Sequence, residues 1–250
     1  MPSALSDHPA GPGEPLARVR DNLAHATQQL LGDTIAVTDQ QWAEPSSLPG
    51  WTRGHVATRL ARNADALGRL ATWALTGEQQ SMYASDDARD AEITSGAGRS
   101  GMELQVDLDT SAGNLGTVFE AIEQAGRWNE KVKLRGGEVV PVALLPLSRL
   151  SEVVVHHVDL DIGFTCDDLS EDMALWLLQW CGHRLASRGD FPPLTLQPTG
   201  GEPVQIGPDA GSTPRTEVSG APGPLVGWLT SRRSADGLTG ADGLNLPSYG

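Results

Sequence analysis

The segment TRGHVATRLARNADALGRLATWALTG, residues 52–77, carries the clearest structural signal in the 250-residue chain. Its apolar residues recur every three or four positions, as they do on one face of an α-helix. Thr52 is typical of an N-cap, and Gly77 is typical of the residue that follows a helix. We therefore predict a helix over residues 52–76 with one face buried. That face consists of Val56, Leu60, Asn63, Leu67, Leu70 and Ala74.

Three further segments share this helical period. The first begins at Leu16 and fades near Trp42, and the others cover residues 102–128 and 146–163. The connection between the second and third helices is long and polar, with room for one short helix. Residues around the Gly136-Gly137 pair alternate weakly, which indicates a small hairpin. Four helices with one long connection predict a four-helix bundle.

The last third of the chain is rich in Gly and Pro and differs from the bundle. We expect a helix over residues 169–187 and a short amphipathic helix over residues 222–233, followed by a loose Gly-rich tail. Short strands are expected at residues 194–197, 204–206 and 216–218.

These elements predict an α+β protein with two domains. The bundle is expected over residues 16–165, and a smaller C-terminal α+β domain over residues 166–250. Residues 1–15 contain four prolines and are expected to form a disordered lead-in.

Charge and composition exclude several classes of protein. The chain has 18 Lys and Arg against 32 Asp and Glu, a net charge of −14, whereas proteins that bind nucleic acid present a basic face. Its first residues lack the basic start and apolar run of a signal peptide, and its longest apolar run, residues 139–148, is too short to span a membrane. We expect a cytoplasmic monomer or weak dimer with neither a nucleic-acid nor a membrane partner.

One spacing suggests a metal site. Glu152 and His156 are four residues apart, so on a helix their side chains point the same way. His55 lies at the edge of the apolar stripe of its helix. The three together would be a His2Glu set, the ligands of a catalytic zinc site with an open fourth position. The simpler interpretation of each motif alone is a solvated Glu–His pair and a hydrogen-bonded boundary histidine.

Arginines are the second signal. Arg89, in the polar connection, and Arg232-Arg233, at the end of the last predicted helix, are placed where a pocket could use them to bind a carboxylate. The simpler alternatives are a surface ion pair for Arg89 and compensation of the helix dipole for Arg232 and Arg233.

Two other patterns carry no function in our interpretation. GAGRSG, residues 96–101, fits the G-x-G-x-x-G pattern, but polar residues precede it where a dinucleotide site requires a buried strand. Cys166 and Cys181 have no accompanying His/Asp pattern, so we expect them to be packing residues.

Three blocks together resemble the mycothiol-dependent maleylpyruvate isomerase family, which belongs to the DinB-like metal-binding bundles. They are LPGWTRGHV (residues 48–56), MYASDDARDAEI (residues 82–93) and EVVVHHVDL (residues 152–160). The resemblance covers the bundle and continues more weakly to Arg233.

This resemblance implies a divalent metal, with zinc expected, on His55, Glu152 and His156, and mycothiol as the thiol cofactor. Arg89 and Arg233 match arginines that hold the small anionic substrate or the thiol. Two departures from the family pattern are compatible with a different substrate. Ser151 stands where a basic residue is expected, and Pro146 stands near an expected aromatic residue.

The implied activity is the cis–trans isomerisation of maleylpyruvate to fumarylpyruvate, a step of aromatic degradation. A metal-bound thiolate would add to the activated double bond, permit rotation and be eliminated. Asp159 would orient a metal-bound histidine where the geometry allows it, and His157 has no assigned role. Two alternatives stay open: an S-transferase that conjugates the thiol to an electrophile, and a non-catalytic bundle that binds metal or thiol.

Overall fold

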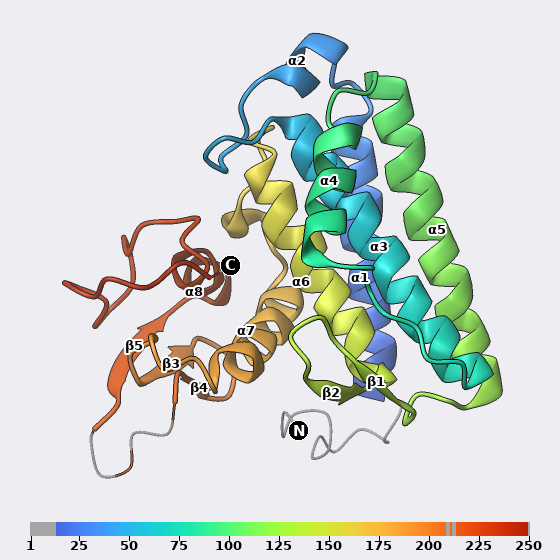
Figure 1. The fold of residues 1–250 in the computed structure, drawn as a ribbon. Helices are drawn as coiled ribbons and strands as arrows, with labels where there is room; N and C mark the ends of the chain where they lie inside the picture. The colour runs from blue at the N-terminus through green and yellow to red at the C-terminus, as the bar shows by residue number, and fades with distance from the viewer. Residues whose placement is uncertain (1–13, 209–210, 212–213, 250) are drawn as a thin grey trace. The chain divides into compact units, whose positions relative to one another are not determined.

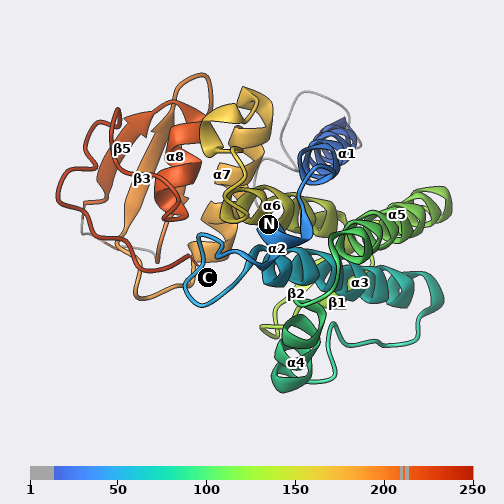
Figure 2. The same cartoon turned by 90° about the horizontal axis from the view of Figure 1, so that it is seen from above.

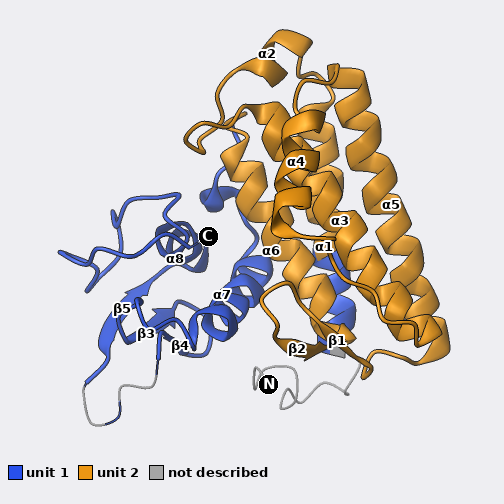
Figure 3. Ribbon diagram, viewed as in Figure 1, with its two compact units in different colours: residues 1–22, 163–250 blue, residues 23–162 orange. Residues whose placement is uncertain are grey.

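The computed structural model describes residues 14–208, 211 and 214–249. The chain divides into two compact units (Figure 3). We call residues 23–162 the bundle unit, and residues 163–250 together with residues 1–22 the C-terminal unit. The predicted lead-in, residues 1–15, lies outside the described residues except for its last two, which already belong to the first helix.

Among the described residues, long helices form a four-helix bundle, as predicted (Figures 1 and 2), and residues 14–22 of the first of these helices are assigned to the C-terminal unit. The helix α3 packs on both α5 and α6. The side-chain amide of Gln105 on α5 donates to the carbonyl of Leu31 on α1 at 3.0 Å. The helices are α1 (Glu14–Thr34), α3 (Arg53–Thr76), α5 (Gly101–Ala125) and α6 (Leu145–Asp159).

The helix α3 begins and ends as its sequence predicts. The Thr52 hydroxyl accepts a hydrogen bond from the backbone of His55, and Gly77 adopts the left-handed conformation, with φ of 79°, that ends the helix. The predicted stripe is buried, and small alanines beside it are buried too, which lets neighbouring helices approach closely. These alanines are Ala57, Ala61, Ala64, Ala66 and Ala71.

The connections between the long helices contain short elements. The helix α2 (Asp39–Ala43), which sequence analysis missed, begins with a capping box formed by Thr38 and Gln41 and buries Trp42. The expected short helix in the polar connection is α4 (Asp86–Gly96), capped by Ser85.

The glycines of the GAGRSG segment serve close packing. A Cβ on Gly96 would lie 2.5 Å from the Thr58 side chain, and one on Gly101 would lie 2.8 Å from that of Trp42. The segment joins α4 to α5 rather than a strand to a helix. The predicted hairpin is present as the antiparallel strands β1 (Lys131–Lys133) and β2 (Val139–Pro141).

Two helices of the bundle end earlier than predicted. The helix α5 ends at Ala125, not Trp128, because Gly126 adopts φ of 63°. The helix α6 ends at Asp159 rather than Gly163, since Asp161 turns the chain with φ of 54°.

The C-terminal unit contains α7 (Glu171–Leu185), a three-stranded sheet and α8 (Pro222–Leu229). The central strand β3 (Leu194–Pro198) pairs antiparallel with β4 (Val204–Ile206) and parallel with β5 (Thr216–Gly220). The helix α8 is buried on nearly all sides, so its predicted amphipathic character is wrong, and it ends before Arg233. No helix among the described residues is long and apolar enough to cross a membrane.

Candidate functional site

An arginine links the start of α3 to the end of α6. Arg53 donates from Nε to the carbonyl of Leu160 at 2.6 Å and from its terminal nitrogen to the carbonyl of Asp161 at 3.0 Å. These bonds satisfy backbone acceptors that the end of α6 leaves free. They hold the first turn of α3, which carries His55, beside the last turn of α6, which carries His156.

Glu152 and His156 converge on α6 as their spacing predicts. His156 Nε2 lies 3.4 Å from Glu152 Oε2. Two ligand atoms bound tetrahedrally to one zinc ion, each at about 2.0–2.1 Å, would be about 3.4 Å apart. The pair therefore has the separation that a shared divalent metal requires.

Asp159 orients the histidine of this pair. Its Oδ2 lies 2.7 Å from His156 Nδ1, and both side chains are buried. A proton on Nδ1 donates to the carboxylate and leaves the lone pair of Nε2 available to a cation or a donor. This is the carboxylate–histidine arrangement that supports metal-ligating imidazoles in proteins.

A second arginine, which sequence analysis did not single out, contacts the same pair. Arg59 Nε donates to His156 Nε2 at 2.6 Å, and its terminal nitrogen lies 3.3 Å from Glu152 Oε2. The signal that could have found it is its spacing, because Arg59 follows His55 by four residues and shares its helix face. The positively charged guanidinium of Arg59 is thus bound to both side chains of the Glu152–His156 pair.

His55 is engaged at the start of its own helix. Its Nδ1 lies 2.8 Å from Thr52 Oγ1 and 3.2 Å from the Thr52 backbone nitrogen, and its ring packs at 5.8 Å from that of Trp51. No other described residue makes a hydrogen bond with its Nε2. Within the described part of the chain, no group of three or more His, Cys, Asp or Glu side chains is arranged to hold a metal. The three-ligand set therefore stays a prediction, with two of its members together.

Electrostatics around the pair favour an ionised carboxylate. Burial raises the pKa of Glu152, but the positive charges of Arg59 and, to a smaller extent, Arg149 hold it well below its ordinary value. Since zinc binds carboxylates in their ionised form, this environment is compatible with a metal ligand.

Arg149 is a buried positive charge one turn before Glu152. It donates to the carbonyl of Leu60 at 2.7 Å and to Asn63 Oδ1 at 2.8 Å, and so joins α6 to α3. Burial lowers the pKa of Arg149 to about 10, against the opposing effects of Glu152, Tyr83 and Asp65. The polar core of the bundle thus extends inward from the Glu152–His156 pair.

Arg89 is buried, although it pairs with the exposed Asp90 at 2.6 Å. Its guanidinium lies 5.8 Å from the centre of the Tyr83 ring. Burial raises the pKa of Tyr83, and Glu152 raises it further, whereas Arg89 and Arg59 lower it. Tyr83 therefore belongs to the electrostatic surroundings of Glu152, and Arg89 interacts with Tyr83.

Arg233 belongs to the C-terminal unit. Its Nε donates to Asp167 Oδ1 at 3.0 Å, and its terminal nitrogen donates to the carbonyl of Asp236 at 2.6 Å. Both Arg232 and Arg233 follow the last turn of α8, and Arg232 donates to the carbonyl of Thr230, the residue that caps the end of the helix. The predicted roles of Arg89 and Arg233 in binding stay predictions.

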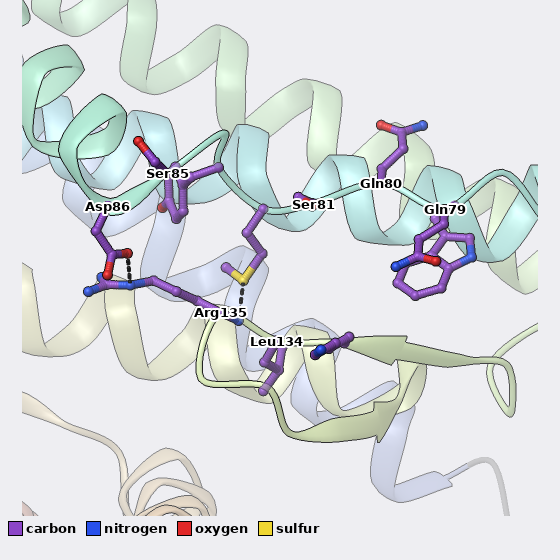
Figure 4. A pocket seen from close by; sticks show the side chains of 11 residues that line it. Gln79, Gln80, Ser81, Ser85, Asp86, Leu134 and Arg135 are labelled. Carbon is purple, nitrogen blue, oxygen red and sulfur yellow. Dashed lines mark hydrogen bonds and ion pairs between the residues drawn. The ribbon is translucent and has the colours of Figure 1, made fainter.

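A cavity of about 290 Å³ has Tyr83 in its lining. Figure 4 shows the labelled side chains of Ser85, Asp86 and Arg135 that also line it. It lies between residues 79–86 and the end of β1, where the Arg135 side chain forms an ion pair with Asp86 at 2.8 Å. Tyr83 lines the cavity and is also the ring beneath Arg89. Neither Glu152 nor His156 lines this cavity, so Tyr83 is the residue that the cavity shares with the surroundings of the pair.

The cysteines do not supply a nucleophile. Both are buried, and burial raises the pKa of Cys181 to about 12. A thiol with this pKa is almost fully protonated at neutral pH and is a poor nucleophile.

Comparison with known proteins points to one family. The sequence profile described as "Mycothiol maleylpyruvate isomerase N-terminal domain" matches residues 23–161. Two solved structures match the chain with a TM-score of 0.81 and 27% sequence identity, over 93% of this chain and 96% of the other. They are crystal structures of the mycothiol-dependent maleylpyruvate isomerase and of its mutant with one histidine replaced by alanine. None of the curated proteins compared with the chain matches it.

Proposed function

Because the chain belongs to the family of the mycothiol maleylpyruvate isomerase N-terminal domain, we propose that it is a thiol-dependent cis–trans isomerase that converts maleylpyruvate to fumarylpyruvate. One observation carries the proposal beyond family membership. Glu152 and His156 present ligand atoms 3.4 Å apart, and a buried carboxylate orients the histidine.

In this proposal His55, Glu152 and His156 hold a divalent metal, with zinc favoured by two imidazoles and one carboxylate. When bound, such a metal lowers the pKa of a coordinating thiol and keeps it ionised near neutral pH. Mycothiol would supply the sulfur nucleophile that adds to the double bond and leaves again, so that the bond can rotate in between.

The chain's own residues would organise the reactants. Asp159 keeps the proton of His156 on Nδ1, so that Nε2 stays available as a ligand. Arg89 would bind a carboxylate of the substrate through its planar guanidinium, which Tyr83 supports from below. Arg233 would bind the second anionic group or the thiol, as the family resemblance implies. No protein nucleophile is needed, which agrees with the buried, protonated thiol of Cys181.

We also propose that the protein acts in the cytoplasm as a monomer or weak dimer, without nucleic-acid or membrane partners. Two free, buried cysteines suit a reducing compartment. A net charge of −14 opposes binding to phosphate backbones.

The test follows substrate and thiol together. Purified protein is incubated with zinc, mycothiol and maleylpyruvate, and fumarylpyruvate and free thiol are both measured over time. An isomerase forms product while the thiol concentration stays constant. Loss of one thiol per substrate would instead identify an S-transferase, and no change in either would identify a non-catalytic bundle.

Variants connect the activity to the proposed site. His55→Ala and Glu152→Gln each remove a proposed ligand and are expected to lower the rate by about 100-fold or more. His25→Ala, which alters an exposed histidine on α1, is the matched control and should keep full activity. Full activity in His55→Ala would contradict the proposed ligand set.

A further inference from the structure

The side chain of Arg59 is bound to the two atoms that the proposed metal would use. Its Nε lies 2.6 Å from His156 Nε2, and its terminal nitrogen lies 3.3 Å from Glu152 Oε2. His156 Nε2 carries the lone pair that Asp159 leaves available, and Glu152 Oε2 is the carboxylate oxygen that faces this nitrogen. The guanidinium therefore bridges both ligands.

A guanidinium and a metal ion cannot use this pair at the same time. A metal requires both ligand atoms at about 2.0–2.1 Å, in the space where the nitrogens of Arg59 now lie. Two positive charges would also face each other across a few ångströms in a partly buried site. Binding of one cation must therefore release the other.

We propose that Arg59 is an internal cation that competes with the divalent metal for Glu152 and His156. The proposal rests on the metal site of the proposed function. It assigns to Arg59 the role of holding the pair in the metal-free protein and of lowering the affinity for metal.

Other features of Arg59 suit this role. Its side chain is 22% exposed, so the guanidinium has a route toward solvent. Among the described residues, its side chain makes hydrogen bonds only with Glu152 and His156. Release of the guanidinium thus breaks these two hydrogen bonds and no other hydrogen bond among the described residues. Without the guanidinium, the metal-free protein would keep the partly buried carboxylate of Glu152 without the arginine that pairs with it. Such an unpaired charge is destabilising.

If Arg59 competes with the metal, its removal should raise the affinity for zinc and lower the stability of the metal-free protein. Arg59→Met removes the guanidinium and keeps a long, flexible side chain. Because hydrogen bonds from a charged donor are strong, we expect Arg59→Met to bind zinc about tenfold to hundredfold more tightly. The same variant should melt at a lower temperature than the parent in EDTA and should gain more from added zinc.

The experiment measures zinc affinity by competition with a chromophoric chelator, and melting temperature with EDTA or with excess zinc. Arg62→Met is the matched control, because Arg62 lies three residues further along α3 and pairs with Asp65 and Asp107 instead. It should change zinc affinity by less than about twofold, since it contacts neither proposed ligand. Arg59→Lys keeps the charge without the planar fork and should lie between the parent and Arg59→Met.

The outcomes separate this inference from the proposed function. Equal zinc affinity in the parent and Arg59→Met would overturn the competition and leave the metal site standing. Absence of zinc binding in the parent and in Arg59→Met would overturn both. If metal-free Arg59→Met does not fold, zinc withdrawal by the chelator is compared between loaded Arg59→Lys and the loaded parent. Tighter retention by Arg59→Lys supports the competition, and equal retention overturns it.

Discussion

The two units of the molecule bury different kinds of side chain. Charged or ionisable side chains buried in the bundle unit are Arg89, Arg149, His156, His157 and Asp159. In the described part of the C-terminal unit, Thr230 is the polar residue that is buried. Leucines, tryptophans and other apolar residues fill its core.

This difference indicates that the cores of the two units are stabilised in different ways. A buried charge is costly unless it is paired and hydrogen-bonded, and an apolar core has no such requirement. In the bundle unit, Arg149, His156 and Asp159 each have a partner, and together with Arg59 they lie around Glu152. The other two buried side chains, Arg89 and His157, lie beside carboxylates elsewhere, those of Asp90 and Asp33. Buried polar networks of this kind are typical of functional sites.

The largest effect is expected when this polar set is broken at its most buried member. Arg149→Met leaves Asn63 Oδ1 without its donor and takes a positive charge away from Glu152. We expect a loss of about 4 kcal/mol in the free energy of unfolding, measured by urea denaturation. Arg135→Met, which breaks an exposed pair with Asp86, should cost less than about 1 kcal/mol. Similar losses in the two variants would show that the buried charges are not what distinguishes the bundle unit.

The corresponding test in the C-terminal unit shortens a buried apolar side chain. Leu178 is fully buried in α7, and Leu178→Ala should cost about 3 kcal/mol because it leaves a cavity. Hydrogen exchange read by mass spectrometry should show reduced protection in residues 163–249, with the peptides of α3 and α6 unchanged. Equal loss of protection in both units would mean that they unfold as one, and the contrast between their cores would then lose its energetic meaning.

A smaller change than in these two core variants is expected in the free energy of zinc binding when the residue that orients His156 is altered. Asp159→Asn keeps the shape of the side chain but replaces the acceptor charge. We expect zinc affinity to fall about 10- to 100-fold, which corresponds to about 1.4–2.8 kcal/mol. Chelator competition measures this loss. Unchanged affinity would assign Asp159 to the stability of the end of α6 alone.

Local signals in the sequence predict much of the bundle. The cap at Thr52, the left-handed Gly77 and the apolar stripe between them place α3 almost to the residue. Local signals do not predict the end of α6. The sequence predicts that the helix ends at Gly163, whereas it ends at Asp159. The carbonyls that follow it bond to Arg53, more than 100 residues earlier in the chain, which no local pattern reveals.

The candidate site shows the same limit. The spacing of Glu152 and His156 predicts that they share a helix face, and the structure places their ligand atoms 3.4 Å apart. That Arg59 reaches this pair depends on how α3 packs on α6 and on the length of its side chain. The sequence shows its position four residues after His55 but not which residues it contacts.

The bonds of Arg53 to Leu160 and Asp161 have a consequence for the order of folding. They close a loop of 107 residues, whereas each helix of the bundle forms from neighbours in the chain. The turn that carries His55 therefore meets the turn that carries His156 only at the entropic cost of closing this long loop. A metal ion finds all its proposed ligands together only once α3 and α6 have docked, so that its binding free energy would add to the stability of that docked arrangement.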